Sequence, residues 1–208
     1  EILSGLVGSE MCIRDRPLTM WCTRSVMQVL NAVAAMVLYG VVAGAFFIQF
    51  ADHELPCPLC LLIRLGMIGA AFGLSLNAWW RPRPLHYGIA LLGAVLGASI
   101  SLRQIALHVV PGTGSYGAAV LGFHLYTWAF IVFSVLVLAI ASVLCFQRQF
   151  DEQRGESPAL VRFAGLSAVI VGLLLSAANF VAVAAECDVR ACPDDPTHYE
   201  GPLRNWDG

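Results

Sequence analysis

The stretch CPLCLLIRLGMIGAAFGLSLNA, residues 57–78, decides the fold because it is long and apolar enough to cross a membrane. A hydrocarbon core of ~30 Å needs a helix of about 20 mostly apolar residues. The only charged side chain in the stretch is Arg64. The stretch therefore predicts a transmembrane helix over Leu59–Ala78, with a cysteine pair where it begins.

The rest of the chain repeats this pattern. Its 208 residues are 58% hydrophobic and 12% charged, with a formal net charge of −2. This composition is typical of multi-span membrane proteins embedded in a lipid bilayer, and it gives no basic field for binding nucleic acid. We predict an all-α membrane protein, a compact transmembrane helix bundle with five spans: Val26–Phe50, Leu59–Ala78, Leu85–Ala106, Leu125–Phe146 and Phe163–Ala185.

Glycine pairs in the first three predicted spans indicate close helix packing. Small residues four positions apart let helix backbones approach closely, although glycine is also simply common in membrane helices. We expect a compact bundle and leave open which motif makes a helix contact. The pairs are Gly40/Gly44, Gly69/Gly73 and Gly93/Gly97.

Arginine placement predicts the orientation. Arginines precede the first span and occupy the loops after the second and fourth spans, whereas the opposite loops, 51–56 and 108–124, have none. By the positive-inside rule, the N-terminus is then cytoplasmic and the C-terminus lies outside. Residues 20–185 form the predicted membrane bundle, and residues 186–208 form an extracytoplasmic tail.

The beginning of the chain does not fit this pattern. Residues 1–16, EILSGLVGSEMCIRDR, do not start with methionine, do not continue into the apolar pattern and resemble translated sequencing-adapter sequence. We expect residues 1–19 to be a non-native leader, with Met20 as the start, and we set Cys12 aside.

The predicted orientation sorts the cysteines by compartment. Four of them lie in two pairs on the outer side, where disulfides form, and two single ones lie near the cytoplasmic face, where thiols stay reduced. The outer pairs are Cys57 with Cys60 and Cys187 with Cys192, and the single residues are Cys22 and Cys145.

The pair Cys57 and Cys60 is spaced for redox chemistry. Residues three apart on a helix share one face at ~5–6 Å, close enough to form a disulfide after a small adjustment. The free N–H groups and dipole of a helix start favour a thiolate. We predict a redox-active pair; an inert structural disulfide is the alternative.

Arg64 lies one helical turn after Cys60 and about one turn inside the bilayer. A charge at that depth costs several kcal/mol unless it reaches the headgroups or finds a partner. Arg64 either snorkels to the outer headgroups or faces a polar site. In the second case it could stabilise a thiolate or an anionic, reduced cofactor.

The run Cys57-x-x-Cys60-x-x-x-Arg64 at the outer end of the second span resembles the disulfide bond formation protein B (DsbB) family. The runs Pro111–Trp128 and Cys192–Pro196 are also similar to it, and the resemblance covers Val26 to Tyr199. It implies a four-helix core and a thiol:quinone oxidoreductase of the bacterial inner membrane. Such a protein reoxidises a periplasmic DsbA-like thiol oxidase and passes the electrons to ubiquinone or menaquinone.

The resemblance also implies roles for individual residues. Cys60 would contact the quinone, Cys57 would exchange disulfides with a second pair, and Arg64 would stabilise the bound quinone. The family carries its second pair between spans three and four, where this chain has no cysteine. We therefore expect Cys187 and Cys192, delivered by a fifth span, to be the relocated second pair; a static staple of the tail is the alternative.

Two polar residues near the outer end of the third span are candidate quinone contacts. Gln104 and His108 lie at the depth where quinone reduction would occur. Quinone reduction needs protons, which histidine can carry, although an interfacial histidine can also be merely a wetted polar residue.

Other functions fit the sequence less well. Four outer cysteines could bind zinc, but an oxidising compartment favours disulfides and Arg64 would repel a cation. An enzyme resembling vitamin K epoxide reductase would carry its quinone-reactive pair late in the bundle. Haem attachment needs a histidine where Leu61 follows Cys60. A transporter or structural bundle stays open, although we expect no buried carboxylate in spans one, three, four and five to mark an ion path.

Overall fold

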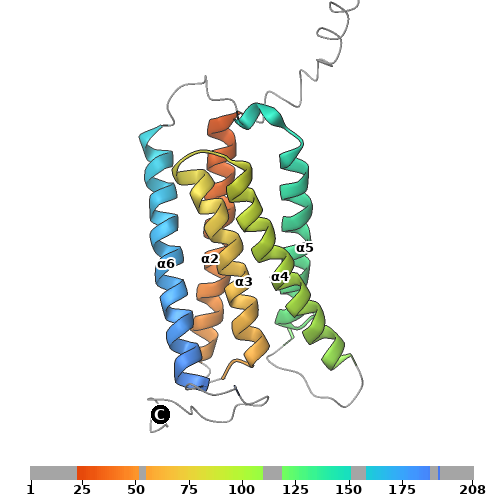
Figure 1. Ribbon diagram of the computed structural model, residues 1–208. Helices are drawn as coiled ribbons and strands as arrows, with labels where there is room; N and C mark the ends of the chain where they lie inside the picture. The colour runs from red at the N-terminus through yellow and green to blue at the C-terminus, as the bar shows by residue number, and fades with distance from the viewer. Residues whose placement is uncertain (1–22, 52–54, 110–118, 151–157, 188–191, 193–208) are drawn as a thin grey trace, which may run out of the picture.

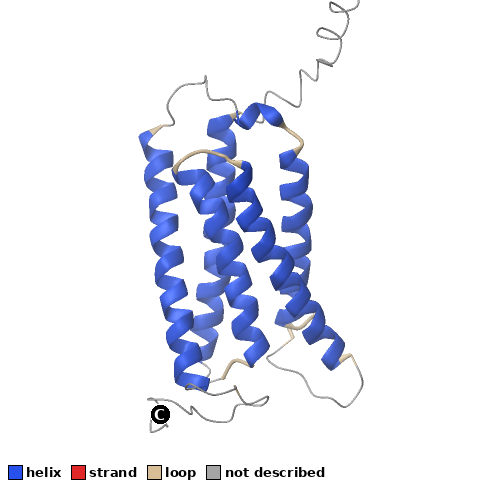
Figure 2. Cartoon of the chain, in the orientation of Figure 1, coloured by secondary structure: helices blue, strands red, loops and turns tan. Residues whose placement is uncertain are grey.

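The computed structural model describes residues 23–51, 55–109, 119–150, 158–187 and 192 of the chain. These residues are almost entirely helical (Figure 2). Five helices are long and apolar enough to cross a membrane, which confirms the predicted fold class. The helices are α2 (Arg24–Ala51), α3 (Pro58–Trp79), α4 (Pro84–His108), α5 (Leu125–Leu144) and α6 (Ala159–Cys187), with a short 3-10 helix η1 (Gln147–Phe150) after α5.

Several sequence predictions lie outside the described residues. They are the leader at 1–19, the start at Met20, the cysteines Cys12 and Cys22, most of the loop 108–124 and most of the tail after Cys187.

Helix α3 lies in the middle of the bundle (Figure 1). Helices α2 and α6 pack against α3 and against each other. Helix α4 packs against the other side of α3, and α5 packs against α4. A larger share of α3 is buried than of any other described helix. The helix that carries the first cysteine pair is thus the one best shielded from lipid.

Close contact between α3 and α4 depends on glycine. A Cβ atom on Gly73 would stand 2.5 Å from the backbone nitrogen of Ala90, and Gly93 is equally tight against α3. No side chain fits there without moving a backbone. Gly40 and Gly44 of α2, in contrast, have nothing within 4 Å. The motifs of the second and third spans therefore make a helix contact, and that of the first does not.

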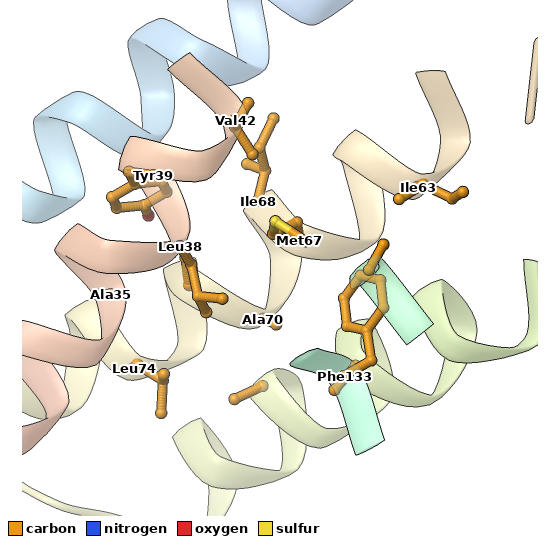
Figure 3. Close-up of a cluster of buried hydrophobic side chains, with 14 of the residues drawn as sticks. Ala35, Leu38, Tyr39, Val42, Ile63, Met67, Ile68, Ala70, Leu74 and Phe133 are labelled. Atoms are coloured by element: carbon orange, nitrogen blue, oxygen red, sulfur yellow. The ribbon is translucent and has the colours of Figure 1, made fainter. Parts of the chain in front are cut away.

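The apolar core lies where α2, α3, α4 and α5 meet (Figure 3). Phe133 of α5 is fully buried, and a Cβ on Gly97 of α4 would collide with its ring. Residues from α2 and α3 complete the centre of the cluster: Leu38, Tyr39, Val42, Met67, Ile68 and Leu74.

Helix α3 begins and α6 ends at the same end of the bundle, the lower end in Figure 1. We call this the cysteine end, because Cys57, Cys60 and Cys187 lie there, and we call the other the opposite end. Helix α6 runs two residues beyond its predicted limit at Ala185, so Glu186 and Cys187 are helical.

Buried polar side chains tie the helices together at the opposite end. Asn77 of α3 donates to Asn31 Oδ1 of α2 at 3.2 Å and accepts from the backbone N–H of Arg83 at 2.9 Å. Asn31 donates in turn to the Tyr87 hydroxyl at 2.8 Å. That hydroxyl donates to Gln149 of η1 at 3.0 Å. This network joins three long helices and η1 through satisfied polar groups.

Candidate functional site

The first turn of α3 is built around Cys57. Proline occupies the first helical position, Pro58, where a missing N–H costs little. Cys57 itself is extended, with φ −65° and ψ 155°, and its sulfur accepts from the Cys60 N–H at 3.2 Å. Cys57 thus acts as the N-cap, and the helix begins at the cysteine pair.

Cys57 and Cys60 form a disulfide across this first turn, with their Cα atoms 5.1 Å apart. Cys57 is buried and Cys60 is half-buried. From α4, the fully buried Gln104 donates its Nε2 to both sulfurs, at 3.1 Å to Cys57 and 3.4 Å to Cys60. The structure therefore brings the predicted residue Gln104 directly onto the predicted pair.

Arg64 points into the protein toward α2. Its Nη1 donates to Gln49 Oε1 at 2.6 Å, and its Nη2 donates to the Ala45 carbonyl at 3.1 Å. The guanidinium carbon also lies 4.8 Å from the centre of the Phe46 ring, a cation–π contact. Only 8% of Arg64 is exposed, and the contacts described here stabilise its charge inside the bundle. Of the two alternatives, this agrees with Arg64 facing a polar site and not with snorkelling to the headgroups.

An apolar groove lies between α2 and α6 beside this arginine. It has a volume of about 390 Å³, and Phe46, Gln49 and Phe50 line its α2 side. Ala178, Ala182 and Ala185 line the facing side with other residues of α6. Gln49 both lines the groove and holds Arg64. The groove is thus lined by apolar residues and one polar residue, Gln49, which is hydrogen-bonded to the buried Arg64.

The second cysteine pair lies at the same end of the bundle. Cys187 and Cys192 form a disulfide with Cα atoms 4.5 Å apart, and Cys187 is buried. Asn179 of α6 donates to the Leu61 carbonyl of α3 at 3.5 Å, which fixes the register of the two helices. Eight further residues of helix rise about 12 Å, so α6 reaches past the start of α3 before Cys187.

Glu186 is a site residue that the sequence analysis missed. Its side chain is fully buried, and neither carboxyl oxygen has a hydrogen-bond partner among the described residues. The predicted fifth span, Phe163–Ala185, contains no carboxylate, but Glu186 follows it directly and lies in the last turn of the same helix.

His108 lies on the α5 side of Gln104. Its Nδ1 is 2.8 Å from the Gln104 carbonyl, and its ring lies 5.6 Å from the Tyr126 ring, centre to centre. The structure thus connects His108 to the backbone of Gln104 and to α5. It does not bring the imidazole onto the cysteine pair through these contacts.

The four outer cysteines are paired rather than free. Zinc binds cysteine as the thiolate, and both outer pairs are oxidised. Within the described part of the chain, no three His, Cys, Asp or Glu side chains group as a metal site would require. The free cysteine there is the exposed Cys145. The structure thus places all four of these cysteines in two disulfides.

Comparison with known proteins points the same way. Residues 27–115 match the family described as Disulfide bond formation protein DsbB. The chain is 33% identical over 78 residues to a Disulfide bond formation protein B from Cupriavidus metallidurans. The aligned stretch covers 37% of this chain and 48% of that protein. One from Chromobacterium violaceum is 36% identical over 76 residues, 35% of this chain and 46% of that protein.

A longer similarity extends further along the chain. A Disulfide bond formation protein B from Verminephrobacter eiseniae is 25% identical over 175 residues, 66% of this chain and 97% of that protein. No solved structure matches. The chain spans about half the length of the first two relatives.

The matched residues contain Cys57, Cys60, Arg64 and Gln104 on α3 and α4. The second pair lies beyond residue 115, and the roles predicted for all these residues stay predictions. Through residues 27–115, the chain is similar to the DsbB family of disulfide bond formation proteins.

Proposed function

We propose that this chain is a membrane thiol:quinone oxidoreductase that supports disulfide bond formation. The observation that supports this most is the arrangement at the start of α3. A disulfide there accepts hydrogen bonds from Gln104, and a buried Arg64 lies one turn deeper beside an apolar groove. A reactive pair, a fixed cation and an apolar approach from the membrane suit electron transfer to a lipid-soluble acceptor.

The residues around the groove fit a quinone, either ubiquinone or menaquinone. A quinone supplies a two-electron acceptor that dissolves in the membrane. The apolar walls formed by Phe46, Phe50 and Ala182 would bind its ring or tail. Arg64, oriented by Gln49, would favour negative charge on the acceptor and on the Cys60 sulfur. Gln104 would hold the sulfurs in place through its amide.

Electrons would enter through the second pair. Thiol–disulfide exchange needs a thiolate of one pair to attack a sulfur of the other and form a mixed disulfide. Cys187 lies at the same end as Cys57, on a helix packed against α3. The donor in this proposal is a soluble DsbA-like thiol oxidase. The arginine distribution supports a bacterial inner-membrane location with the cysteine end in the periplasm.

The function is tested by coupled turnover of the purified chain. A reduced DsbA-like protein should be oxidised while added ubiquinone is reduced, one quinone for each disulfide formed. Replacing Cys57 or Cys60 with alanine should abolish both activities, whereas Cys145→Ala, at the opposite end, should leave them unchanged. Electron transfer that survives without both cysteines of the first pair would show the proposal to be wrong.

The same assay tests the tail pair. Cys187→Ala and Cys192→Ala should stop oxidation of the protein donor, and one of them should leave a trapped mixed disulfide with it. Full turnover in both variants would show that the tail disulfide is a static staple.

A further inference from the structure

Glu186 has the features of a reactive group rather than of a packing residue. Burying a polar group without hydrogen bonds costs free energy, and burying an unpaired carboxylate costs more. Glu186 is 0% exposed, and both of its oxygens lack a hydrogen bond from the described residues. Its neighbour in the chain is Cys187, which is itself buried and disulfide-bonded.

Glu186 lies on the face of α6 that packs against the start of α3. Asn179 and Ala182 precede it by seven and four residues, which places all three side chains on one face. All three are buried, and Asn179 reaches the Leu61 carbonyl at 3.5 Å. The Asn179 Oδ1 also has no partner among the described residues. This face therefore presents unsatisfied oxygens at the helix end nearest the cysteine pairs.

The charged surroundings of Glu186 are simple within the described residues. Arg64 is the charged residue that α3 contributes. The half of α2 that reaches the cysteine end, residues 40–51, contains no titratable side chain. In α6 the titratable residue that precedes Glu186 is Arg162, at the opposite end of the helix. The parts of α2 and α3 at the cysteine end thus contribute one described cation, Arg64, to the surroundings of this acid.

We propose that Glu186 is a proton-transfer residue of the thiol–disulfide site, and this inference rests on the function proposed above. It takes the proton from a tail thiol that becomes the attacking thiolate. It returns that proton to the sulfur that leaves. Proton transfer by a positioned carboxyl group is general acid–base catalysis.

The exchange balances when Glu186 carries one proton in each step. A thiolate of the reduced tail pair attacks the Cys57 sulfur, a bond forms between them, and the Cys57–Cys60 bond breaks. Cys60 leaves with the electron pair and takes the proton held by Glu186. The second tail thiol then gives its proton to Glu186 and attacks the first tail sulfur, which reforms the tail disulfide and releases Cys57 to be protonated. Two electrons and two protons have moved, and Glu186 is again a carboxylate.

The test uses the full chain, freed of quinone and without a protein donor. Reduced dithiothreitol is added, and the free thiols that appear at each cysteine are trapped and counted over time between pH 5 and 9. In E186Q, which keeps the size of the side chain, we expect exchange to be about 100-fold slower, the lower end for loss of general acid–base catalysis. The pH dependence that Glu186 gives to the rate should disappear.

The second readout is the infrared spectrum recorded over time while the protein is being reduced. A band of protonated carboxyl should appear transiently in the wild type and be absent from E186Q. Asn179→Ala removes a polar group from the same face but no acid, so it should keep both the band and the pH profile. A purely structural role would lower stability without moving either readout.

A wild-type rate and pH profile in E186Q, or a carboxyl band that persists there, would overturn the proposal. Should E186Q fail to form both disulfides, Glu186→Asp decides, because it keeps the acid and shortens its reach. We expect Glu186→Asp to slow exchange about 10-fold, and an unchanged rate would count against Glu186. Since the assay contains neither quinone nor donor protein, its result is independent of whether coupled turnover occurs.

Discussion

The two ends of the bundle differ in how the buried oxygens of several side chains are hydrogen-bonded. At the opposite end, Asn31, Asn77 and Tyr87 are hydrogen-bonded to one another or to neighbouring helices. At the cysteine end, Asn179 and Glu186 keep oxygens without partners among the described residues. Buried polar groups in proteins are normally satisfied, and each exception calls for an explanation. This difference fits a structural role for the opposite end and, in the function proposed above, a reactive role for the cysteine end.

Of the substitutions that test this difference between the two ends, Arg64→Ala should have the largest effect, which we expect on quinone binding. It removes two charge-assisted hydrogen bonds and the cation beside the groove. Loss of one charge-assisted contact to the bound acceptor would cost about 1.5–3 kcal/mol, so the KM for ubiquinone should rise about 10- to 100-fold. Both disulfides should still form. Steady-state quinone reduction with a reduced dithiol donor measures the effect, and unchanged quinone kinetics would mean that Arg64 serves only the fold.

The next effect should be on stability, from Asn77→Leu at the opposite end. This change leaves Asn31, the Arg83 N–H and His86 without one partner each. Stability should fall by about 1–3 kcal/mol, seen as a lower unfolding midpoint in detergent micelles.

The matched control for Asn77→Leu is Ser99→Ala. Ser99 is exposed on α4 and bonds only within its own helix, to the Val95 carbonyl, so its loss should leave the midpoint unchanged. Disulfide exchange should run at the wild-type rate in both variants. Slowed exchange in Asn77→Leu would contradict the division of roles between the two ends.

The smallest effect should come from Gln49→Met, which keeps the length of the side chain but removes the acceptor for Arg64. Arg64 retains the Ala45 carbonyl and the Phe46 ring. We expect a rise of about 3- to 10-fold in the KM for quinone, because one hydrogen bond of about 1 kcal/mol net is lost. An effect as large as that of Arg64→Ala would show that Gln49 binds the acceptor itself.

Much of the fold could be predicted because lipid imposes length and composition. Helix α3 was expected over Leu59–Ala78 and runs Pro58–Trp79, since proline and the turn before Arg81 bound one continuous apolar run. The end of α6 was not predictable by this criterion. Hydropathy stops at Ala185, but the helix continues to Cys187, and Glu186 and Cys187 are buried there.

The cysteine site was predicted in part. The spacing of Cys57, Cys60 and Arg64 on one helix follows from the sequence, but the choice of Gln49 as the partner of Arg64 depends on how α2 packs. The network at the opposite end left a signal, because Asn31 and Asn77 are amides inside apolar spans and such residues usually bond across helices. Gln149 left no such signal in the sequence, because its position in the network depends on how η1 packs against Tyr87.

The position of α6 has a consequence for the order of synthesis. A chain is made from its N-terminus and folds in that order, so α3 and its cysteine pair exist before α6 has been translated. The second pair follows the last described helix. A nascent chain therefore carries the pair that would face the acceptor well before it carries the pair that would supply electrons. In the proposed function, the relay would be complete only once α6 is in place, so a chain that still lacks α6 could not draw electrons from its donor through the tail.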